Sequence, residues 1–226
     1  MNNIAYNIDC MEYMRTLPEN AFDLAVVDPP YGISADRKLH SRTLTKNGSS
    51  LASQTIYHYS DWDRSKPSKE YFDELRRVSR NQIIWGANHF ISQLAFDSPC
   101  WIVWDKDNGN NGYADCELAW TSFRCAVRRF KWRWHGMLQE DMKHKEKRIH
   151  PTQKPVALYD WLLRKFANPG DKILDTHLGS GSSRISAYRL GYDFVGCEID
   201  ATYFAQQEDR FKRATELDGL FSPEPL

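Results

Sequence analysis

The sequence lacks the features that mark secreted, membrane-spanning or metal-binding proteins. It has no basic N-terminal leader with an apolar core, and no apolar run approaches the length of a membrane span. No two cysteines form a C-x-x-C pair, which argues against a zinc knuckle and a disulfide framework; the five are Cys10, Cys100, Cys116, Cys125 and Cys197. We therefore expect a cytoplasmic protein with no metal and no membrane segment.

The formal net charge is zero, because 30 lysines and arginines balance 30 aspartates and glutamates. A zero total conceals where the charges lie, so their distribution along the chain has to be considered segment by segment. The 226 residues are 41% hydrophobic and 13% aromatic, which suffices for one well-buried domain. Strand-like and helix-like segments alternate from the N-terminus onward. This order predicts an α/β fold with a parallel sheet.

The clearest motif is Asp28-Pro29-Pro30-Tyr31, which follows the apolar run 22–27. An earlier strand is expected over residues 3–9, and it ends on Asp9. Proline continues neither a strand ladder nor a helix, and it restricts the residue before it. The chain therefore leaves the sheet in a fixed direction at Asp28, and we expect a rigid pocket edge there.

A second motif lies near the C-terminus, where residues 172–175 and 194–198 read as strands and 184–190 as a helix. Between the first strand and the helix stands the small-residue turn Gly179-Ser180-Gly181-Ser182-Ser183. Glycines let a backbone approach a ligand closely, and an acid ending the second strand, here Glu198, suits ribose hydroxyls. The turn lacks the full G-x-G-x-x-G spacing, which counts against a dinucleotide. A nucleotide-binding β-α-β unit is the favoured interpretation, and a structural turn is the alternative.

Two segments concentrate polar and basic residues. Residues 32–66 form a long polar stretch, and residues 124–148 carry nine basic side chains against three acidic ones, with Phe130, Trp132 and Trp134 between them. Such a pattern suits phosphate contact and base stacking, whereas a solvated face with a buried aromatic core is the plain alternative. The candidate DNA-binding residues are Arg37, Lys38, Arg42, Arg128, Arg129, Lys131, Arg133, Lys143 and Lys145.

Taken together, these motifs resemble the beta-class, circularly permuted DNA amino-methyltransferases that use S-adenosylmethionine. The resemblance rests on the Asp28 motif, on His150-Pro151-Thr152-Gln153-Lys154-Pro155, and on the glycine loop from Asp175 to Ser182, in this order. It implies a Rossmann-like methyltransferase sheet, mostly parallel with an antiparallel strand. It also implies a catalytic half over 1–123, a short target-recognition region over 124–149 and a cofactor-binding half over 150–226.

The resemblance also implies which residues hold S-adenosylmethionine. In the permuted order the strand ending at Asp9 should lie beside the one ending at Glu198. Thr176 and His177 depart from the family's proline and phenylalanine, but the glycines remain and binding is still expected. The implied cofactor residues are Asp9, Cys10, Thr152, Gln153, Lys154, Asp175, His177, Gly179, Ser180, Gly181, Ser182 and Glu198.

The activity that the resemblance implies is methylation of the N6 amino group of adenine in double-stranded DNA. Asp28 and the Pro29 carbonyl would accept the amino hydrogens, Tyr31 would stack on the extruded base, and no covalent nucleophile is needed. N4-methylation of cytosine is the alternative chemistry. A catalytically silent nucleic-acid-binding module is the alternative of another class. The short recognition region points to a possible homodimer.

Overall fold

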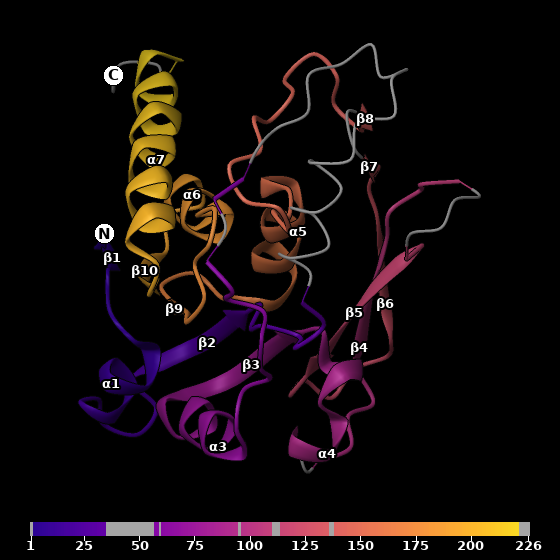
Figure 1. Ribbon diagram of the computed structural model, residues 1–226, viewed down its shortest axis with the longest axis vertical. Coiled ribbons are helices and arrows are strands. Elements are labelled where there is room, and N and C mark those ends of the chain that lie inside the picture. The colour runs from indigo at the N-terminus through magenta and orange to yellow at the C-terminus, as the bar shows by residue number, and fades with distance from the viewer. Residues whose placement is uncertain are drawn as a thin grey trace.

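The protein is described by a computed structural model over residues 2–34, 57–58, 60–94, 96–109, 114–135 and 138–221. Its centre is an eight-stranded sheet in the order β1-β10-β9-β2-β3-β5-β4-β6 (Figure 1). A separate two-stranded sheet pairs β7 (Trp134–His135) with β8 (Leu138–Gln139). The strands of the main sheet are β1 (Asn3–Tyr6), β2 (Phe22–Val27), β3 (Ser79–Trp85), β4 (Trp101–Asp105), β5 (Cys116–Thr121), β6 (Arg128–Lys131), β9 (Lys172–Asp175) and β10 (Asp193–Cys197).

The main sheet is mostly parallel, with β5 antiparallel to both of its neighbours, β3 and β4. The N-terminal strand β1 pairs in parallel with β10 near the C-terminus, so that Tyr6 lies opposite Cys197. The two ends of the sequence therefore build one half of the sheet together. Both the predicted fold class and the predicted neighbourhood of the Asp9 and Glu198 strands are confirmed.

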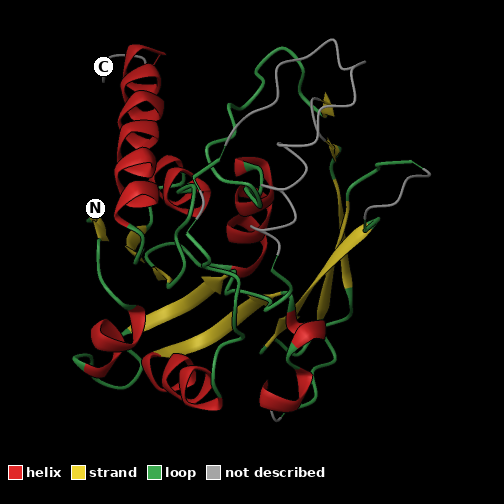
Figure 2. Cartoon of the chain, viewed as in Figure 1, coloured by secondary structure: helices red, strands yellow, loops and turns green. Residues whose placement is uncertain are grey.

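Helices cover both faces of the sheet (Figure 2). On one side lie α5 (Val156–Phe166), α6 (Ser182–Arg189) and α7 (Ala201–Phe221), and on the other α1 (Cys10–Arg15), α3 (Lys69–Val78) and α4 (Ile91–Leu94). A short 3-10 turn, η1 (Ala87–His89), follows β3. No helix within the described ranges has both the length and the apolar character needed to cross a bilayer.

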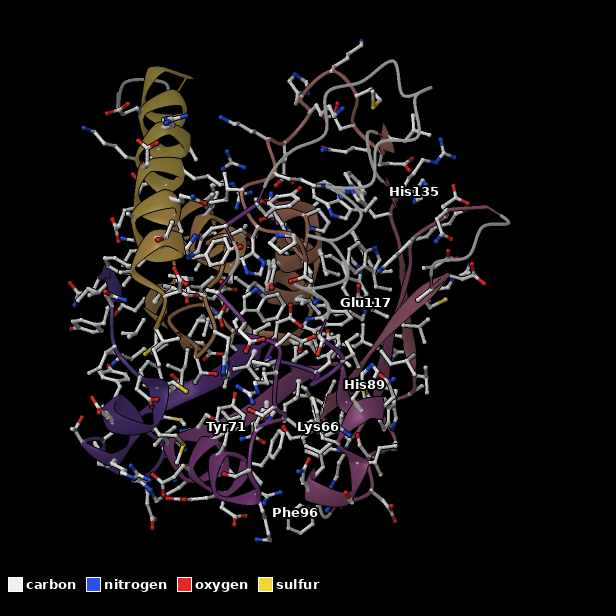
Figure 3. All side chains as sticks on the ribbon, in the orientation of Figure 1. Lys66, Tyr71, His89, Phe96, Glu117 and His135 are labelled. Atoms are coloured by element: carbon white, nitrogen blue, oxygen red, sulfur yellow. The ribbon has the colours of Figure 1, made fainter. Side chains whose placement is uncertain are left out.

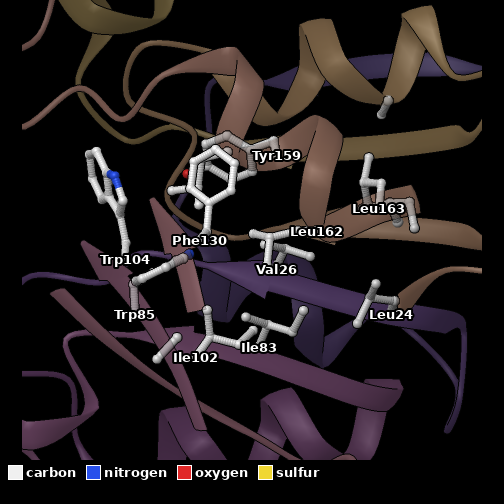
Figure 4. Packing of buried hydrophobic residues seen from close by; sticks show 14 of the residues in the cluster. Leu24, Val26, Ile83, Trp85, Ile102, Trp104, Phe130, Tyr159, Leu162 and Leu163 are labelled. Atoms are coloured by element: carbon white, nitrogen blue, oxygen red, sulfur yellow. The ribbon is translucent and has the colours of Figure 1, made fainter. Parts of the chain in front are cut away.

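Strand β2 shows why both faces are covered. Leu24 and Val26 pack with the α5 side chains in one core (Figure 4). Ala25 and Val27 pack with α1 and α3 in the other. Alternate side chains of a strand point to opposite faces, so a continuous apolar run needs a layer on each. Burial of each large apolar side chain contributes about 1.5–3 kcal/mol. The run 22–27 is thus a central strand, as predicted.

The basic segment is less separate from the sheet than its composition indicates. Strand β6 pairs in parallel with β4 and forms the edge of the main sheet. Phe130 and Trp134 belong to the buried core, and Trp132 packs against it. These aromatics are apolar anchors, which was the plain alternative to base stacking. Part of the predicted recognition region therefore builds the sheet.

Candidate active site

The two principal motifs emerge at the same edge of the sheet because β2 and β9 are parallel neighbours, with Ala25 opposite Leu174. The carboxyl ends of adjacent parallel strands open into one crevice, where α/β proteins bind their ligands. A cavity of about 190 Å³ lies there. Its walls are Asp28, Pro30, Trp62, His150, Thr152, Gln153, Lys154, Tyr159, His177, Leu178, Gly179, Ser180, Glu198, Ile199, Asp200 and Tyr203.

Asp28 belongs to a half-buried chain of hydrogen bonds and ion pairs. Its Oδ1 accepts the hydroxyl of Tyr31 at 2.7 Å, and its Oδ2 accepts the ammonium of Lys154 at 2.5 Å. The same ammonium lies 3.0 Å from Oε2 of Glu117, whose other oxygen pairs with Lys106. The Lys154 side chain is only 3% exposed. Two acids and two ammonium groups therefore alternate beside the cavity.

Burial and pairing act in opposite directions on the charges of this chain. Burial raises the pKa of Asp28 above its ordinary value, although the Lys154 ammonium lowers it. Burial also acts to raise the pKa of Glu117, but the ammonium groups of Lys154 and Lys106 outweigh it and hold that pKa at about 2. The pKa of Lys154 is raised, because Asp28 and Glu117 together outweigh its burial. Glu117 and Lys154 therefore keep their charges, and Asp28 is the more easily protonated acid.

Tyr31 is held in place by a glycine and a histidine. Its ring stacks on His89, with centroids 5.0 Å apart and planes 18° apart. Gly86 has a φ of +69°, and a Cβ built on it would overlap the Tyr31 ring. Only glycine combines this backbone conformation with such a close approach. Because His89 stacks on the ring and the hydroxyl donates to Asp28, the position of Tyr31 is fixed, and its stacking on a base stays a prediction.

The glycine loop is braced by the acids around it. Gly179 donates its amide to Oε2 of Glu198 at 2.8 Å, and Asp200 donates its amide to Oε1 at 2.9 Å. Asp175 accepts the amide of His177 at 3.0 Å and the hydroxyl of Ser183 at 2.5 Å. Burial raises the pKa of Asp175 to about 7. The loop therefore keeps its shape through carboxylates, one of which titrates near neutrality.

The two departures from the family motif have their own partner in α3. The hydroxyl of Thr176 lies 2.7 Å from the Tyr71 hydroxyl and 2.9 Å from Nδ1 of His177. Burial lowers the pKa of His177 to about 4 and that of His150 to about 3, so both rings are neutral at pH 7. Thr176 and His177 thus form a bonded unit with Tyr71.

The structure brings most of the predicted cofactor residues together and leaves some outside. Seven of them line the cavity: Thr152, Gln153, Lys154, His177, Gly179, Ser180 and Glu198. Of these, Lys154 lies with the first motif, since its ammonium contacts Asp28. Among the described residues, Asp9, Cys10, Asp175, Gly181 and Ser182 are not in the cavity wall, and neither are Pro29 and Tyr31.

Asp9 has a local structural task. Its Oδ1 accepts the amides of Met11 and Glu12 and so caps α1, the arrangement expected of an aspartate at a helix start. Burial raises the pKa of Cys10 to about 12, so its thiol is neutral. The cofactor roles of both residues remain predictions.

The predicted DNA-binding residues differ in their exposure and in whether an acidic side chain pairs with them. Arg129 lies 3.9 Å from Asp105, while Lys131 and Arg133 pair with Asp107 at 3.0 and 2.9 Å. Arg128 is half-buried, and Lys143 and Lys145 are exposed. Arg37, Lys38 and Arg42 lie outside the described residues.

Several residues near the site were not predicted. Glu117 and Lys106 enter through the antiparallel pairing of β5 with β4, which no local pattern indicates. Trp62 and Tyr203 reach the cavity beside His150, with ring centroids 5.1 and 4.4 Å from its ring. The polar segment 32–66 carries Trp62, and an aromatic residue among polar ones was the available signal.

Arg148 was also missed. Its guanidinium lies 4.5 Å over the ring of Trp134, and among the described residues its Nε and Nη2 are buried without a hydrogen-bond acceptor. It therefore differs from Arg129, Lys131 and Arg133, which have acidic partners. A buried guanidinium without an acceptor is suited to an anionic ligand.

Comparison with known proteins places this geometry in context. Residues 124–209 match the family model N6_N4_Mtase, described as DNA methylase. The type II methyltransferase M.HinfI of Haemophilus influenzae is 25% identical over 90% of this chain and 67% of its own length. The putative methylase YubD of Escherichia coli K12 is 27% identical, covering 96% of both chains.

Solved structures share the fold. The complex of M1.HpyAVI with SAM superposes with a TM-score of 0.55 at 22% identity, covering 91% of this chain and 98% of that one. The putative DNA modification methylase TTHA0409 of Thermus thermophilus gives 0.58 at 19% identity over 95% of both chains. The cytosine-N4-specific PvuII DNA methyltransferase gives 0.58 at 12% identity over 96% of this chain and 91% of that one. The chain has the α/β methyltransferase fold, and its residues 124–209 are similar in sequence to the DNA methylase family model.

Proposed function

We propose that this protein transfers the methyl group of S-adenosylmethionine to the N6 amino group of adenine in double-stranded DNA. The observation that supports this most is the placement of the two motifs. Asp28 and Pro30 stand in the same cavity wall as Gly179, Ser180 and Glu198. A methyl acceptor beside Asp28 would thus face a cofactor beside the glycine loop, within one enclosed space.

The cavity residues fit S-adenosylmethionine chemically. The cofactor has ribose hydroxyls that donate hydrogen bonds and a cationic methionine end, and the cavity presents the carboxylates of Asp28, Glu198 and Asp200. Each carboxylate oxygen has two acceptor sites, so Glu198 still has acceptors left for the ribose after it binds two backbone amides. Thr152 and Gln153 would enclose the other end. When bound, the cofactor supplies an electrophilic methyl group on its sulfonium.

The amino group to be methylated needs help because its lone pair is delocalised into the base. Asp28 and the Pro29 carbonyl would accept its two hydrogens, which favours a tetrahedral nitrogen and stabilises the positive charge that develops on it. Burial raises the pKa of Asp28, and the Lys154 ammonium opposes that rise and so favours the anion. The prolines fix the direction of both acceptors, so the amino group is oriented before the methyl arrives.

The DNA must open for this chemistry, because the amino group is paired inside a duplex. The base would be extruded into the cavity, and basic side chains would hold the backbone while it is out of the stack. Lys143 and Lys145 are exposed, and Arg148 has nitrogens without an acceptor. Exposed side chains such as those of Lys143 and Lys145 can reach phosphates directly.

Adenine is favoured over cytosine by the aspartate that begins the motif, since family members that modify cytosine more often begin it with serine. The test is to incubate the protein with unmodified mixed-sequence duplex and S-adenosylmethionine carrying a deuterated methyl group, then analyse the nucleosides by mass spectrometry. Deuterated N6-methyldeoxyadenosine is expected. Deuterated N4-methyldeoxycytidine would show that the target base is cytosine instead of adenine. DNA that carries no deuterated methyl group would overturn the proposal.

We also propose a cytoplasmic homodimer. The basic segment that lies outside the main sheet is short, so a second subunit would help to hold the duplex. Light scattering at the assay concentration should give twice the chain mass of 26.4 kDa. An active monomer at that concentration would contradict the dimer and leave the methyl transfer untouched.

A further inference from the structure

Each oxygen of the carboxylate that should receive the target amino group already accepts one hydrogen bond. Tyr31 donates to Oδ1 of Asp28 at 2.7 Å, and Lys154 donates to Oδ2 at 2.5 Å. An amino group entering the cavity would therefore meet an ion pair. The positive charge that develops on its nitrogen would also lie close to a like charge, which opposes the electrostatic stabilisation that Asp28 offers.

A second carboxylate is in position to take the ammonium of Lys154. Oε2 of Glu117 lies 3.0 Å from Nζ, so the ammonium already touches both acids. An ammonium has three N–H donors and can shift toward one partner without losing all of its hydrogen bonds. The Tyr31 hydroxyl, 3.3 Å from Nζ, lies beside both partners. A small movement of Nζ toward Glu117 would leave Asp28 paired only with Tyr31.

Glu117 is itself fixed in place. It lies on β5 opposite Trp104 of β4, and Lys106 lies two residues beyond Trp104 and so on the same face (Figure 3). Lys106 forms an ion pair with Oε1 of Glu117, and its backbone amide donates to the Asp115 carbonyl at 2.9 Å. Glu117 thus keeps Oε2 directed at Lys154, and its own charge is held by Lys106.

We propose that Glu117, anchored by Lys106, takes over the ammonium of Lys154 when the target amino group enters, and so frees Oδ2 of Asp28 to accept an amino hydrogen. Glu117 and Lys106 are positioning residues in this account, since both act through Lys154. The inference rests on the proposed function, because it concerns the acceptor of that methyl transfer.

The test compares methyl transfer to mixed-sequence duplex by the wild type and by Glu117→Gln, Lys106→Met, Lys154→Met and the double variant Glu117→Gln/Lys154→Met. Glu117→Gln should lower kcat about 10-fold or more, which is less than the roughly 100- to 1,000-fold loss typical of a direct transition-state contact. Lys106→Met should lower it less, because Glu117 remains. The dissociation constant for S-adenosylmethionine, measured by calorimetry, should stay within about 3-fold, a shift of under 1 kcal/mol.

The double variant separates this account from a merely structural role. Without the Lys154 ammonium, Glu117 has nothing to take over, so Glu117→Gln should lower kcat less when it is added to Lys154→Met than when it is added to the wild type. Non-additivity of this kind is the signature of residues acting through one another. Glu70→Gln on α3, which removes the exposed pair with Arg15 of α1, is the matched control and should leave kcat unchanged.

Each outcome bears on a different claim. A wild type that binds S-adenosylmethionine but labels no DNA contradicts the proposed function. An active wild type with an equally active Glu117→Gln overturns the transfer of Lys154 to Glu117, as does an equal loss of kcat from Glu117→Gln in the wild type and in Lys154→Met. Thermal unfolding of each variant checks that it is folded, and if Glu117→Gln is not, an unchanged kcat in Lys106→Met overturns the inference.

Discussion

Two clusters of charge in this protein have the same alternating pattern and different surroundings. Asp28, Lys154, Glu117 and Lys106 alternate beside the cavity, where the Lys154 side chain is 3% exposed. At the sheet edge Asp107 pairs with Lys131, whose side chain is 54% exposed. Water and salt screen the second pair, whereas the first interacts through a medium of low dielectric constant. Burial rather than pairing therefore marks the charges that this site depends on.

The largest effect expected is on stability, when the same substitution is made in each cluster. Lys154→Met leaves the half-buried carboxylates of Asp28 and Glu117 without their shared partner and should cost at most about 3–5 kcal/mol of unfolding free energy. Lys131→Met removes a screened surface pair and should leave the urea midpoint unchanged within error. Urea unfolding of both variants at pH 7.5 makes the comparison. Equal urea midpoints would show that the two clusters contribute equally to stability, whatever their burial.

The next effect concerns two glycines with left-handed backbones. At Gly86 an added Cβ overlaps the Tyr31 ring, whereas at Gly170, with φ +89°, it meets no atom within 4 Å. Gly86→Ala should displace Tyr31 from Asp28 and lower kcat about 10- to 100-fold, as small misplacements at active sites do. Gly170→Ala carries only the backbone strain of about 1 kcal/mol and should keep full kcat. Similar kcat values for the two variants would contradict the claim that the position of Tyr31 beside Asp28 matters for catalysis.

A smaller effect is expected from the titration of Asp175. Its pKa of about 7 lies above the ordinary value because burial disfavours the charged form. The carboxylate forms as pH rises through that pKa, and an anion beside the loop favours a cationic ligand. Affinity for S-adenosylmethionine should thus rise up to about 10-fold from pH 6 to pH 8. Calorimetry across this range should show the rise in the wild type and none in Asp175→Asn.

The two histidines in the cavity wall do not interfere with that measurement. His150 and His177 have pKa values of about 3 and 4, so both stay neutral from pH 6 to pH 8. A pH dependence that persists in Asp175→Asn would place the titrating group elsewhere and contradict the assignment.

The smallest effect is expected at the surface. Arg129 has Asp105 nearby, whereas Arg148 has two buried nitrogens with no acceptor in the described part of the chain. Arg148→Gln should weaken DNA binding by a few-fold. It should also reduce the slope of log binding constant against log salt concentration by about 1, the value for one phosphate contact. Arg129→Gln should change the salt slope less. Fluorescence anisotropy at several salt concentrations compares them, and the reverse order would show that ion pairing does not decide which arginine meets DNA.

Much of the fold was predictable because its signals are local. Apolar runs marked β2, β9 and β10, and the glycines marked the loop before α6, where Gly181 has a φ of +73°. The order of the motifs then predicted that the N-terminal strand lies beside β10, which the pairing of Tyr6 with Cys197 confirms. These features depend on residues close together in sequence or on the order of whole elements.

The rest was not predictable because it depends on contacts between distant residues of ordinary type. Glu117 meets Lys154 only because β5 runs antiparallel between β3 and β4, and a glutamate in a strand gives no sign of that. Phe130 and Trp134 suit a core as well as a base stack, so only their packing in the folded core decides between the two roles. The stack of Tyr31 on His89 is likewise a contact between residues far apart in the sequence.

The most direct test of the central claim is methyl transfer by wild type and Asp28→Ala, measured side by side with S-adenosylmethionine labelled in its methyl group. The wild type should label duplex DNA. Asp28→Ala should bind the cofactor with similar affinity and label DNA at least about 1,000-fold more slowly, because it lacks the acceptor for the developing charge. An Asp28→Ala variant that keeps its rate would contradict the account, as would a wild type that binds the cofactor and leaves DNA unlabelled.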